Sequence, residues 1–168
     1  MIMSLLLPTK SNLAALSLAI ITVWASVSLS SMFHRQALEL LPASHWLEVK
    51  HLDVASHSVD EMSVPLVYDH VAHEAIFARW YAEIDNADTN VDVCDGSGES
   101  HVAPNDKLPV DNIVKLEWYM GHKCDLPAGR YVLKSFYRIY AEEDVVKTFT
   151  VISNIFKVTD AATASTQP

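Results

Sequence analysis

The sequence predicts one apolar helix near the N-terminus followed by an all-β domain built as an antiparallel β-sandwich. Residues 11–33 contain no charged side chain, and a run of that length is enough to cross about 30 Å of hydrocarbon as a helix. After about residue 45, short segments with apolar side chains at every second position alternate with turn residues, which is typical of a sandwich. The 168-residue chain is long enough for one domain with its own core.

The apolar segment is predicted to be a retained transmembrane anchor. Its 23 residues, 11–33, exceed the length of an ordinary signal-peptide core. Six serines dilute its hydrophobicity, and Ser26-Val-Ser28 and Ser28-Leu-Ser30 have the small residues of a cleavage site. A removable signal peptide is therefore the alternative, and it would leave a secreted domain.

The predicted organisation has a short tail at residues 1–10, the helix at 11–33 and a connector at 34–45. The basic residues on the two sides of the helix nearly balance, so charge does not fix the orientation. We expect the C-terminal domain on the extracytoplasmic side, in the periplasm or at the cell surface, because paired cysteines suit an oxidising compartment.

The first half of the domain contains three predicted strands, at Trp46–Val54, Val64–Val71 and Glu74–Asp85. In the third strand, the apolar residues at even positions from Ile76 to Ile84 alternate with a mixed set of aromatic and charged residues. This period-two pattern directs Trp80 into the core. The following residues, 85–112, are rich in Asp, Asn, Gly and Pro. We expect a long loop there, with one short strand near Val91–Cys94.

The second half contributes a core strand at Ile113–Met120, in which Leu116 and Trp118 point inward and Tyr119 points outward. Arg130–Tyr140 follows with one apolar face, and Val145–Val158 closes the domain with a bulge expected near Ser153-Asn154. The sandwich is assigned to residues 46–159, and residues 160–168 are a polar tail.

The segment Leu126-Pro-Ala-Gly129-Arg-Tyr131-Val-Leu133 resembles the tyrosine corner of immunoglobulin-like and fibronectin-III-like sandwiches. Ser153-Asn-Ile-Phe-Lys-Val158 is similar to the closing strand of such domains. The resemblance implies an Ig-like fold in which Gly129 permits the turn and the Tyr131 hydroxyl binds backbone at that corner. The chain departs from the antibody pattern because Cys124 precedes the tyrosine.

The overall plan also resembles small uncharacterised single-pass membrane proteins of tailed phages and marine bacteria. The shared features are a Gly-Ser-Gly loop, a Trp-bearing strand, the Cys124-to-Tyr131 corner and the closing strand. That resemblance implies a phage protein that acts at the host envelope.

Two cysteines, Cys94 and Cys124, are the only ones in the chain. We expect one disulfide, which would close a loop of about 30 residues and stabilise the domain by roughly 3–4 kcal/mol. The alternative is two unrelated buried thiols in a reducing compartment.

The charge distribution excludes nucleic acid as a partner. Residues from Gln36 onward carry 10 basic and 21 acidic side chains, a balance of −11. Such a surface repels phosphate backbones and would steer basic partners toward the domain.

The sequence predicts no metal, cofactor or catalytic site. His70 and His73 stand three apart, which places them on opposite faces of a strand. The segment Asp92–Glu99 has acids and glycines without calcium-loop spacing. Ser97 lies between glycines, but no histidine or carboxylate can be assigned to it as a partner from spacing.

Four aromatic residues form the predicted partner surface, since they fall on the outward faces of two strands: Phe77, Tyr81, Phe136 and Tyr140. The alternative is that other segments cover them or that the two faces are reversed. We predict a non-enzymatic, membrane-anchored module that binds a protein or glycan or serves a structural role. The second hypothesis is a secreted enzyme or carbohydrate-processing module that uses residues 85–112, with Asp95, Ser97 and Glu99 as its test positions.

Overall fold

The computed structural model describes residues 10–104, 112–141 and 145–160, with side chains from residue 15 onward. The predicted tails at 1–10 and 160–168 therefore lie almost wholly outside the described residues. The chain divides into two compact units, Met1–Leu41 and Pro42–Pro168.

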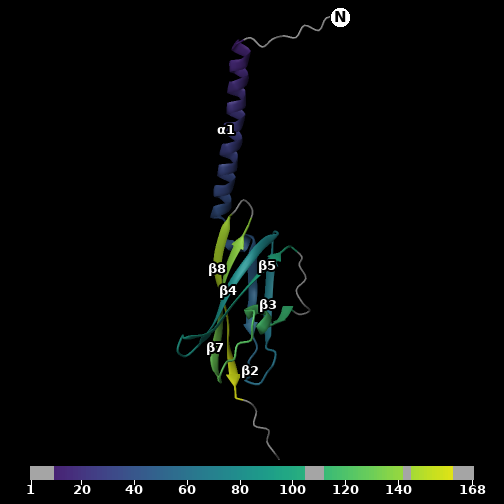
Figure 1. Ribbon diagram of the computed structural model, residues 1–168, viewed down its shortest axis with the longest axis vertical. Helices are drawn as coiled ribbons and strands as arrows, with labels where there is room; N and C mark the ends of the chain where they lie inside the picture. The colour runs from purple at the N-terminus through teal and green to yellow at the C-terminus, as the bar shows by residue number, and fades with distance from the viewer. Residues whose placement is uncertain (1–9, 105–111, 142–144, 161–168) are drawn as a thin grey trace, which may run out of the picture. The chain divides into compact units, whose positions relative to one another are not determined.

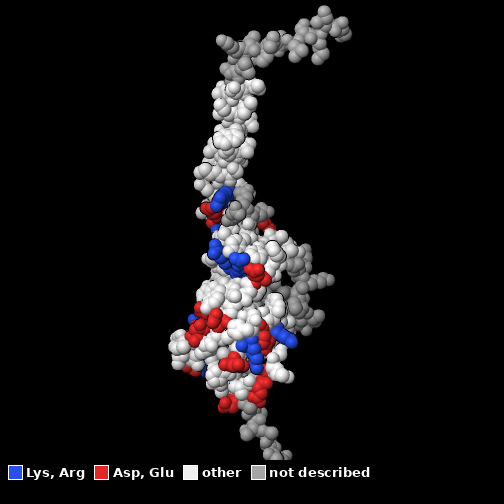
Figure 2. Space-filling model, in the orientation of Figure 1, with Lys and Arg blue, Asp and Glu red and all other residues white. Residues whose placement is uncertain are grey.

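The first unit consists of helix α1, Lys10–Leu40 (Figure 1). An 18-residue window within its segment Ala15–Leu40 has a mean hydropathy of 1.8, so the helix is long and apolar enough to span a membrane. Figure 2 shows its surface free of charged side chains over most of its length. The helix continues beyond the predicted end at Phe33 and includes most of the predicted connector.

Hydroxyl groups within α1 bond to the helix itself. Thr22 and Ser26 donate to the carbonyls four residues earlier, Leu18 and Thr22, each at 2.8 Å, and Ser31 donates to the Ser28 carbonyl at 2.9 Å. This pairing lowers the cost of placing a hydroxyl in hydrocarbon. The serines that dilute the apolar run are thus compatible with a spanning helix.

The second unit is mostly β and contains two sheets (Figure 1). After the 3-10 turn Ala43–His45, the three-stranded sheet has the order β1-β3-β6, formed by Leu47–Val54, Pro65–Ala72 and Ile113–Lys115. The five-stranded sheet curls into a half-barrel in the order β2-β8-β7-β4-β5, formed by His57–Ser58, Val146–Thr159, Gly129–Tyr140, Ile76–Asn86 and Asp92–Val102. All neighbours are antiparallel except β2 and β8.

The inner faces of β4 and β7 form the centre of the core. Period-two alternation buries Trp80 and Ile84 on β4, and Leu133 and Tyr137 on β7, as the sequence predicts. Burying a large apolar side chain contributes about 1.5–3 kcal/mol, so this shared face is a major source of the domain's stability.

The side chain of Asn154 joins the two sheets at one edge. Its amide accepts a hydrogen bond from Val54 N at 2.8 Å and donates to Val54 O at 3.0 Å. The β7–β8 register shifts between Val132 and Lys134, next to Ser153, whose Oγ accepts from Leu133 N at 2.9 Å. The predicted bulge in this region is confirmed, and it frees Asn154 to bind β1.

The predicted core strand at Ile113–Met120 is wrong in its second half. Only Ile113–Lys115 is extended, and Leu116–Met120 forms the short helix α2, which Gly121 ends in the left-handed conformation at φ 80°. Helical turning exchanges the faces: Tyr119 is fully buried, whereas Trp118 is 58% exposed. The signal was present, since Leu116, Tyr119 and Met120 follow the i, i+3, i+4 spacing of a helix and a glycine follows them.

The prediction of a long loop with one short strand near Val91–Cys94 is wrong for residues 92–102, and residues 105–111 of the predicted loop lie outside the described residues. Strand β5 occupies Asp92–Val102 and pairs with β4 along its length. Two glycines that suggested a loop allow close approach instead. A Cβ on Gly96 would lie 2.2 Å from the Met120 carbonyl oxygen, and one on Gly98 would lie 2.2 Å from the Trp80 ring.

Candidate functional site

The four predicted surface aromatics lie together on the outer face of the five-stranded sheet. Phe77 is the ladder partner of Tyr140, and Tyr81 is the partner of Phe136. Their ring centroids lie 5.7 Å and 6.2 Å apart, respectively. Two strands therefore present two cross-strand aromatic pairs on one face.

Two arginines lie between these pairs. Arg79 and Arg138 are directly opposite each other in the β4–β7 ladder. The Arg79 guanidinium lies 5.2 Å from the Phe77 ring centroid, and that of Arg138 lies 5.2 Å from Tyr140, within the range of cation–π attraction. We call these six residues the aromatic–arginine face: Phe77, Arg79, Tyr81, Phe136, Arg138 and Tyr140.

The sequence reasoning missed the two arginines, although a signal for them was present. Residues 77–81 read Phe-Ala-Arg-Trp-Tyr, and residues 136–140 read Phe-Tyr-Arg-Ile-Tyr. Both follow the pattern Phe-x-Arg-x-Tyr, whose named positions point to one side of a strand. Antiparallel pairing of two such segments sets phenylalanine opposite tyrosine and arginine opposite arginine.

The face is accessible at the end formed by Tyr81 and Phe136. Tyr81 is 41% exposed and Phe136 is 39% exposed, whereas their chain neighbours Trp80 and Tyr137 are 7% and 1% exposed. The two faces of the strands are therefore not reversed. Within the β domain, the described residues leave this face partly open to solvent.

The charges on the face are unequally neutralised. Arg79 donates to the Glu99 carboxylate on β5 at 2.9 Å. Arg138 forms no ion pair with the residues that the structure describes. Partial burial, followed by the nearby carboxylates of Asp95 and Glu83, raises the pKa of Tyr81. Its hydroxyl is therefore a neutral donor at neutral pH.

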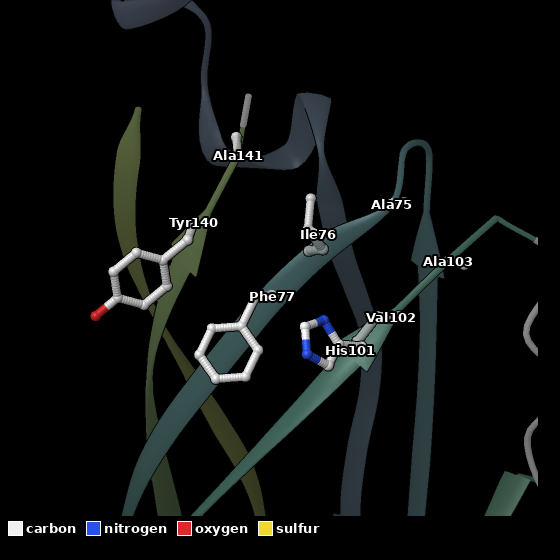
Figure 3. Close-up of a pocket in the computed structure, with 8 residues that line it drawn as sticks. All are labelled: Ala75, Ile76, Phe77, His101, Val102, Ala103, Tyr140 and Ala141. Carbon is white, nitrogen blue, oxygen red and sulfur yellow. The ribbon is translucent and has the colours of Figure 1, made fainter. Parts of the chain in front are cut away.

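An open cavity of about 450 Å³ lies at one end of the face (Figure 3). Tyr140, Phe77 and His101 come from β7, β4 and β5 and form a row of rings there. The Phe77 centroid lies 5.7 Å from that of Tyr140 and 4.9 Å from that of His101. The row adds a ring-lined hollow to the aromatic–arginine face.

A buried hydroxyl cluster lies on the opposite, inner side of β7. The Tyr119 hydroxyl is 2.6 Å from Ser135 Oγ and 2.5 Å from the Tyr137 hydroxyl. Burial is the main cause that raises the pKa of Tyr68, Tyr119 and Tyr137 far above the usual value. These groups remain neutral, so they satisfy one another inside the core and offer no base or nucleophile.

Cys94 and Cys124 form a disulfide, with their Cα atoms 6.0 Å apart. His122 lies beside it, with Nε2 3.5 Å from Cys94 Sγ. One ligand atom from each of the three residues lies within 4.8 Å of the others. His122 is exposed and the two cysteines are half-buried. The sequence reasoning missed His122, although it stands only two positions before a cysteine.

The predicted corner has its expected hydrogen bond. The Tyr131 hydroxyl donates to the Pro127 carbonyl at 2.8 Å. The expected turn role of Gly129 is not found, because Gly129 begins β7 without a positive φ, and a Cβ there would make a tight contact 3.0 Å from that hydroxyl. The corner sets the start of β7 and thereby the register of Phe136, Arg138 and Tyr140.

The remaining sequence candidates are not brought together as sites. The His70 and Tyr68 ring centroids lie 4.7 Å apart, and neither His70 nor His73 belongs to a group of three or more possible metal ligands among the described residues. The acidic segment Asp92–Glu99 lies along β5, so its carboxylates do not wrap around one point. Ser97 lies opposite Tyr81 in the ladder.

No known protein family and no curated protein sequence matches this chain. The functional conclusion therefore depends on the geometry of its own residues.

Proposed function

We propose that this protein is a non-enzymatic binding module, held at a membrane by α1, that contacts a protein partner through the aromatic–arginine face. Aromatic residues and arginine are the side chains most enriched at the energetic centres of protein interfaces. The face gathers six of them on two neighbouring strands.

The observation that carries this proposal is the Arg79–Arg138 pair. Like charges directly opposite in a sheet are destabilising, and each cross-strand pair is worth roughly 0.2–1 kcal/mol. Arg79 is offset by its ion pair with Glu99, whereas Arg138 has only the ring of Tyr140 beside it and no carboxylate among the described residues. A partner carboxylate seated between the aromatic pairs would turn the cost into binding energy, because charge-assisted hydrogen bonds to arginine are strong.

The chemistry of the proposed partner follows from the long-range field of the domain and from the short-range contacts at the face. The acidic domain as a whole attracts basic surfaces at long range, and Figure 2 shows acidic and basic side chains intermingled on its visible face. At the contact itself, Arg138 requires an acidic group and the rings require apolar or aromatic surface. We therefore propose a partner protein with an overall basic surface and an acidic side chain at the contact.

The Ig-like assignment is part of the proposal. In the constant-type Ig sandwich, strands A, B, E and D form one sheet and strands C, F and G form the other. The order β1-β3-β6 is compatible with strands A, B and E, and the run β8-β7-β4 within the second sheet is compatible with G, F and C, whereas β5 pairs with β4 and no strand beside β6 takes the place of D among the described residues. The hydrogen bond of Tyr131 at the start of the penultimate strand supports it further.

The extracytoplasmic location is supported by the disulfide, since such bonds persist in oxidising compartments. The apolar helix α1 supports retention at a membrane, and both candidate cleavage sites lie within it. A phage-encoded protein that acts at the host envelope is the concrete form that the sequence resemblance gives to this proposal.

The alternative of a secreted enzyme using residues 85–112 has less support. Asp95, Ser97 and Glu99 occupy alternate positions of one strand, so successive side chains are about 7 Å apart. Glu99 is also engaged by Arg79. A glycan that stacks on the ring row of Phe77, Tyr140 and His101 is a second class of ligand that the tests below distinguish.

The location is tested by labelling intact cells with a membrane-impermeant maleimide, with and without reduction. We expect labelling only after reduction and only in the membrane fraction. Labelling that needs lysis and no reductant would contradict an exported domain, and label in the medium would contradict a retained anchor.

The binding function is tested by purifying the tagged full-length protein from its membrane together with bound proteins. The variant Arg138→Glu should lose a specific companion that the wild type retains, and Lys50→Glu on the other sheet should keep it. Equal recovery with both variants would contradict the proposed surface. Recovery of a glycan in place of a protein would contradict the proposed partner class.

A further inference from the structure

The cluster of Cys94, His122 and Cys124 carries an inference that is independent of the partner surface. We propose that reduction of this disulfide creates a zinc site in which the two thiolates and the His122 imidazole are the protein ligands. The site exists only in the reduced protein, so metal binding reports the redox state of its surroundings.

The donor set fits zinc. Zinc binds cysteine sulfur at about 2.3 Å and histidine nitrogen at about 2.0–2.1 Å in tetrahedral geometry. Those bond lengths require a sulfur–nitrogen separation of about 3.5 Å and a sulfur–sulfur separation of about 3.8 Å. Cys94 Sγ and His122 Nε2 are already 3.5 Å apart. Once their bond is broken the two sulfurs must move apart, and Cys124 Sγ, which lies within 4.8 Å of the His122 ligand atom, must reach the same sulfur–nitrogen separation.

Contacts other than the disulfide hold the segment that leads to His122. Trp80 Nε1 donates to the Tyr119 carbonyl at 3.0 Å, which fixes the end of α2 against β4. Gly96 lets the β5 backbone meet Met120. The left-handed Gly121 then turns the chain so that His122 and Cys124 return to Cys94. The two sides of the site therefore remain in contact after reduction.

The surroundings allow both reduction and metal entry. His122 is exposed, and the two cysteines are half-buried. A water molecule can occupy the fourth coordination position, as in zinc sites with three protein ligands. The Cys94 N–H donates to Asp92 Oδ1 at 3.1 Å, so the strand that carries one ligand is fixed locally.

The chemical steps balance with an external dithiol as reductant. Thiol–disulfide exchange converts the dithiol to its own disulfide, and the Cys94–Cys124 bond becomes two thiols. Zinc then forms two Zn–S bonds and one Zn–N bond, and the two thiol protons are released. No electron is transferred in the metal-binding step.

The test uses the full-length protein in detergent micelles, with zinc alone as the probe. Samples are left oxidised or are reduced with a phosphine, which does not compete as a thiol. Zinc bound per chain and its affinity are measured by competition with a chromophoric chelator. The oxidised protein serves as the control for zinc held by its other histidines.

We expect the reduced protein to bind one more zinc ion per chain than the oxidised protein. His122→Ala, which leaves the disulfide in place before reduction, should weaken this additional site at least tenfold. His73→Ala, at another exposed histidine, should leave it unchanged. Near-ultraviolet circular dichroism of the reduced protein should match that of the oxidised protein.

Three results would overturn the proposal. One is equal zinc binding by the reduced and oxidised proteins. Another is unchanged affinity in reduced His122→Ala, which would remove the imidazole from the ligand set. The third is loss of the near-ultraviolet signal on reduction alone, since the site would then not survive reduction.

Discussion

The two faces of the β4–β7 strand pair have similar aromatic content and opposite environments. On the inner face Trp80 and Tyr137 are 7% and 1% exposed, while on the outer face Tyr81 and Phe136 are 41% and 39% exposed. Aromatic content alone therefore does not identify the core. The alternation of the strands and the charged residues that accompany each set distinguish the two faces.

The polar groups of the two faces also differ in how fully they are paired within the protein. The inner face pairs its hydroxyls with one another, as Tyr119 does with Ser135 and Tyr137. The outer face places Arg79 opposite Arg138 and leaves one of them without an ion pair among the described residues. The inner face is arranged for stability, and the outer face retains groups that a partner can use.

The largest expected effect separates the two faces directly. Tyr137→Ala should lower the free energy of unfolding by about 4 kcal/mol, since it leaves a cavity in the core. Phe136→Ala, one residue earlier on the outer face, should cost less than about 1 kcal/mol. Denaturant unfolding of the full-length protein in micelles measures both, and similar losses would contradict the assigned faces.

A second prediction concerns an ion pair at the edge of the outer face. Asp85 is 4% exposed and pairs with Lys134, and this contact is the main cause that raises the pKa of Lys134. Lys134→Met would leave the Asp85 carboxylate buried without its cation and should therefore lower the free energy of unfolding measured with denaturant.

The matched control for Lys134→Met is Arg138→Met, which removes one of two adjacent like charges. It should be neutral or stabilise the domain by a few tenths of a kcal/mol. A loss for Arg138→Met as large as that for Lys134→Met would show that Arg138 has a structural role.

A third prediction uses pH to read the inner hydroxyls. Burial raises the pKa of Tyr68, Tyr119 and Tyr137, whereas an unfolded tyrosine titrates near 10. The stability that these buried hydroxyls contribute to the folded state is therefore fully present below about pH 10. It is lost as pH rises further, because these tyrosines then ionise only in the unfolded state. Ionisation of each of these tyrosines in the unfolded state should lower the free energy of unfolding by about 1.4 kcal/mol at pH 11.

The contribution of one inner tyrosine is isolated with Tyr68→Phe. Its stability should decline less steeply than that of the wild type between about pH 10 and pH 11. Denaturant unfolding at each pH measures the decline. An identical decline in the two proteins would contradict the burial of this hydroxyl in a site that resists ionisation.

The smallest expected effect is at the corner that precedes β7. Tyr131→Phe removes the hydrogen bond to Pro127 and should cost about 1 kcal/mol. Tyr140→Phe on the outer face should cost no more than a few tenths. Equal values in denaturant unfolding would mean that the corner hydroxyl does not help to set the register of β7.

The elements with clear alternation could be predicted from the sequence. Trp80 was assigned inward, and Arg130–Tyr140 was given one apolar face, because period-two patterning is a local property of the chain. The four outer aromatics followed from the same rule. Their assembly into cross-strand pairs required the β4–β7 register, which depends on contacts between residues about sixty positions apart.

The misassigned segments share a cause. Gly96 and Gly98 read as loop residues, yet they are small because Met120 and Trp80 occupy the space beside them. Leu116–Met120 fits both a strand and one helical turn, and tertiary packing around Tyr119 decides for the helix. His122 joins the disulfide only through that turn, so the sequence did not reveal the cluster.

The proposed partner surface is tested most directly by photo-cross-linking in cells. A photo-reactive phenylalanine analogue replaces Phe136 in one variant and Val49, on the three-stranded sheet, in another. We predict a discrete protein adduct from position 136 that is absent from position 49 and disappears when Arg138→Glu is added. Adducts from position 49 alone, or adducts from position 136 that persist with Arg138→Glu, would contradict the aromatic–arginine face as the partner surface.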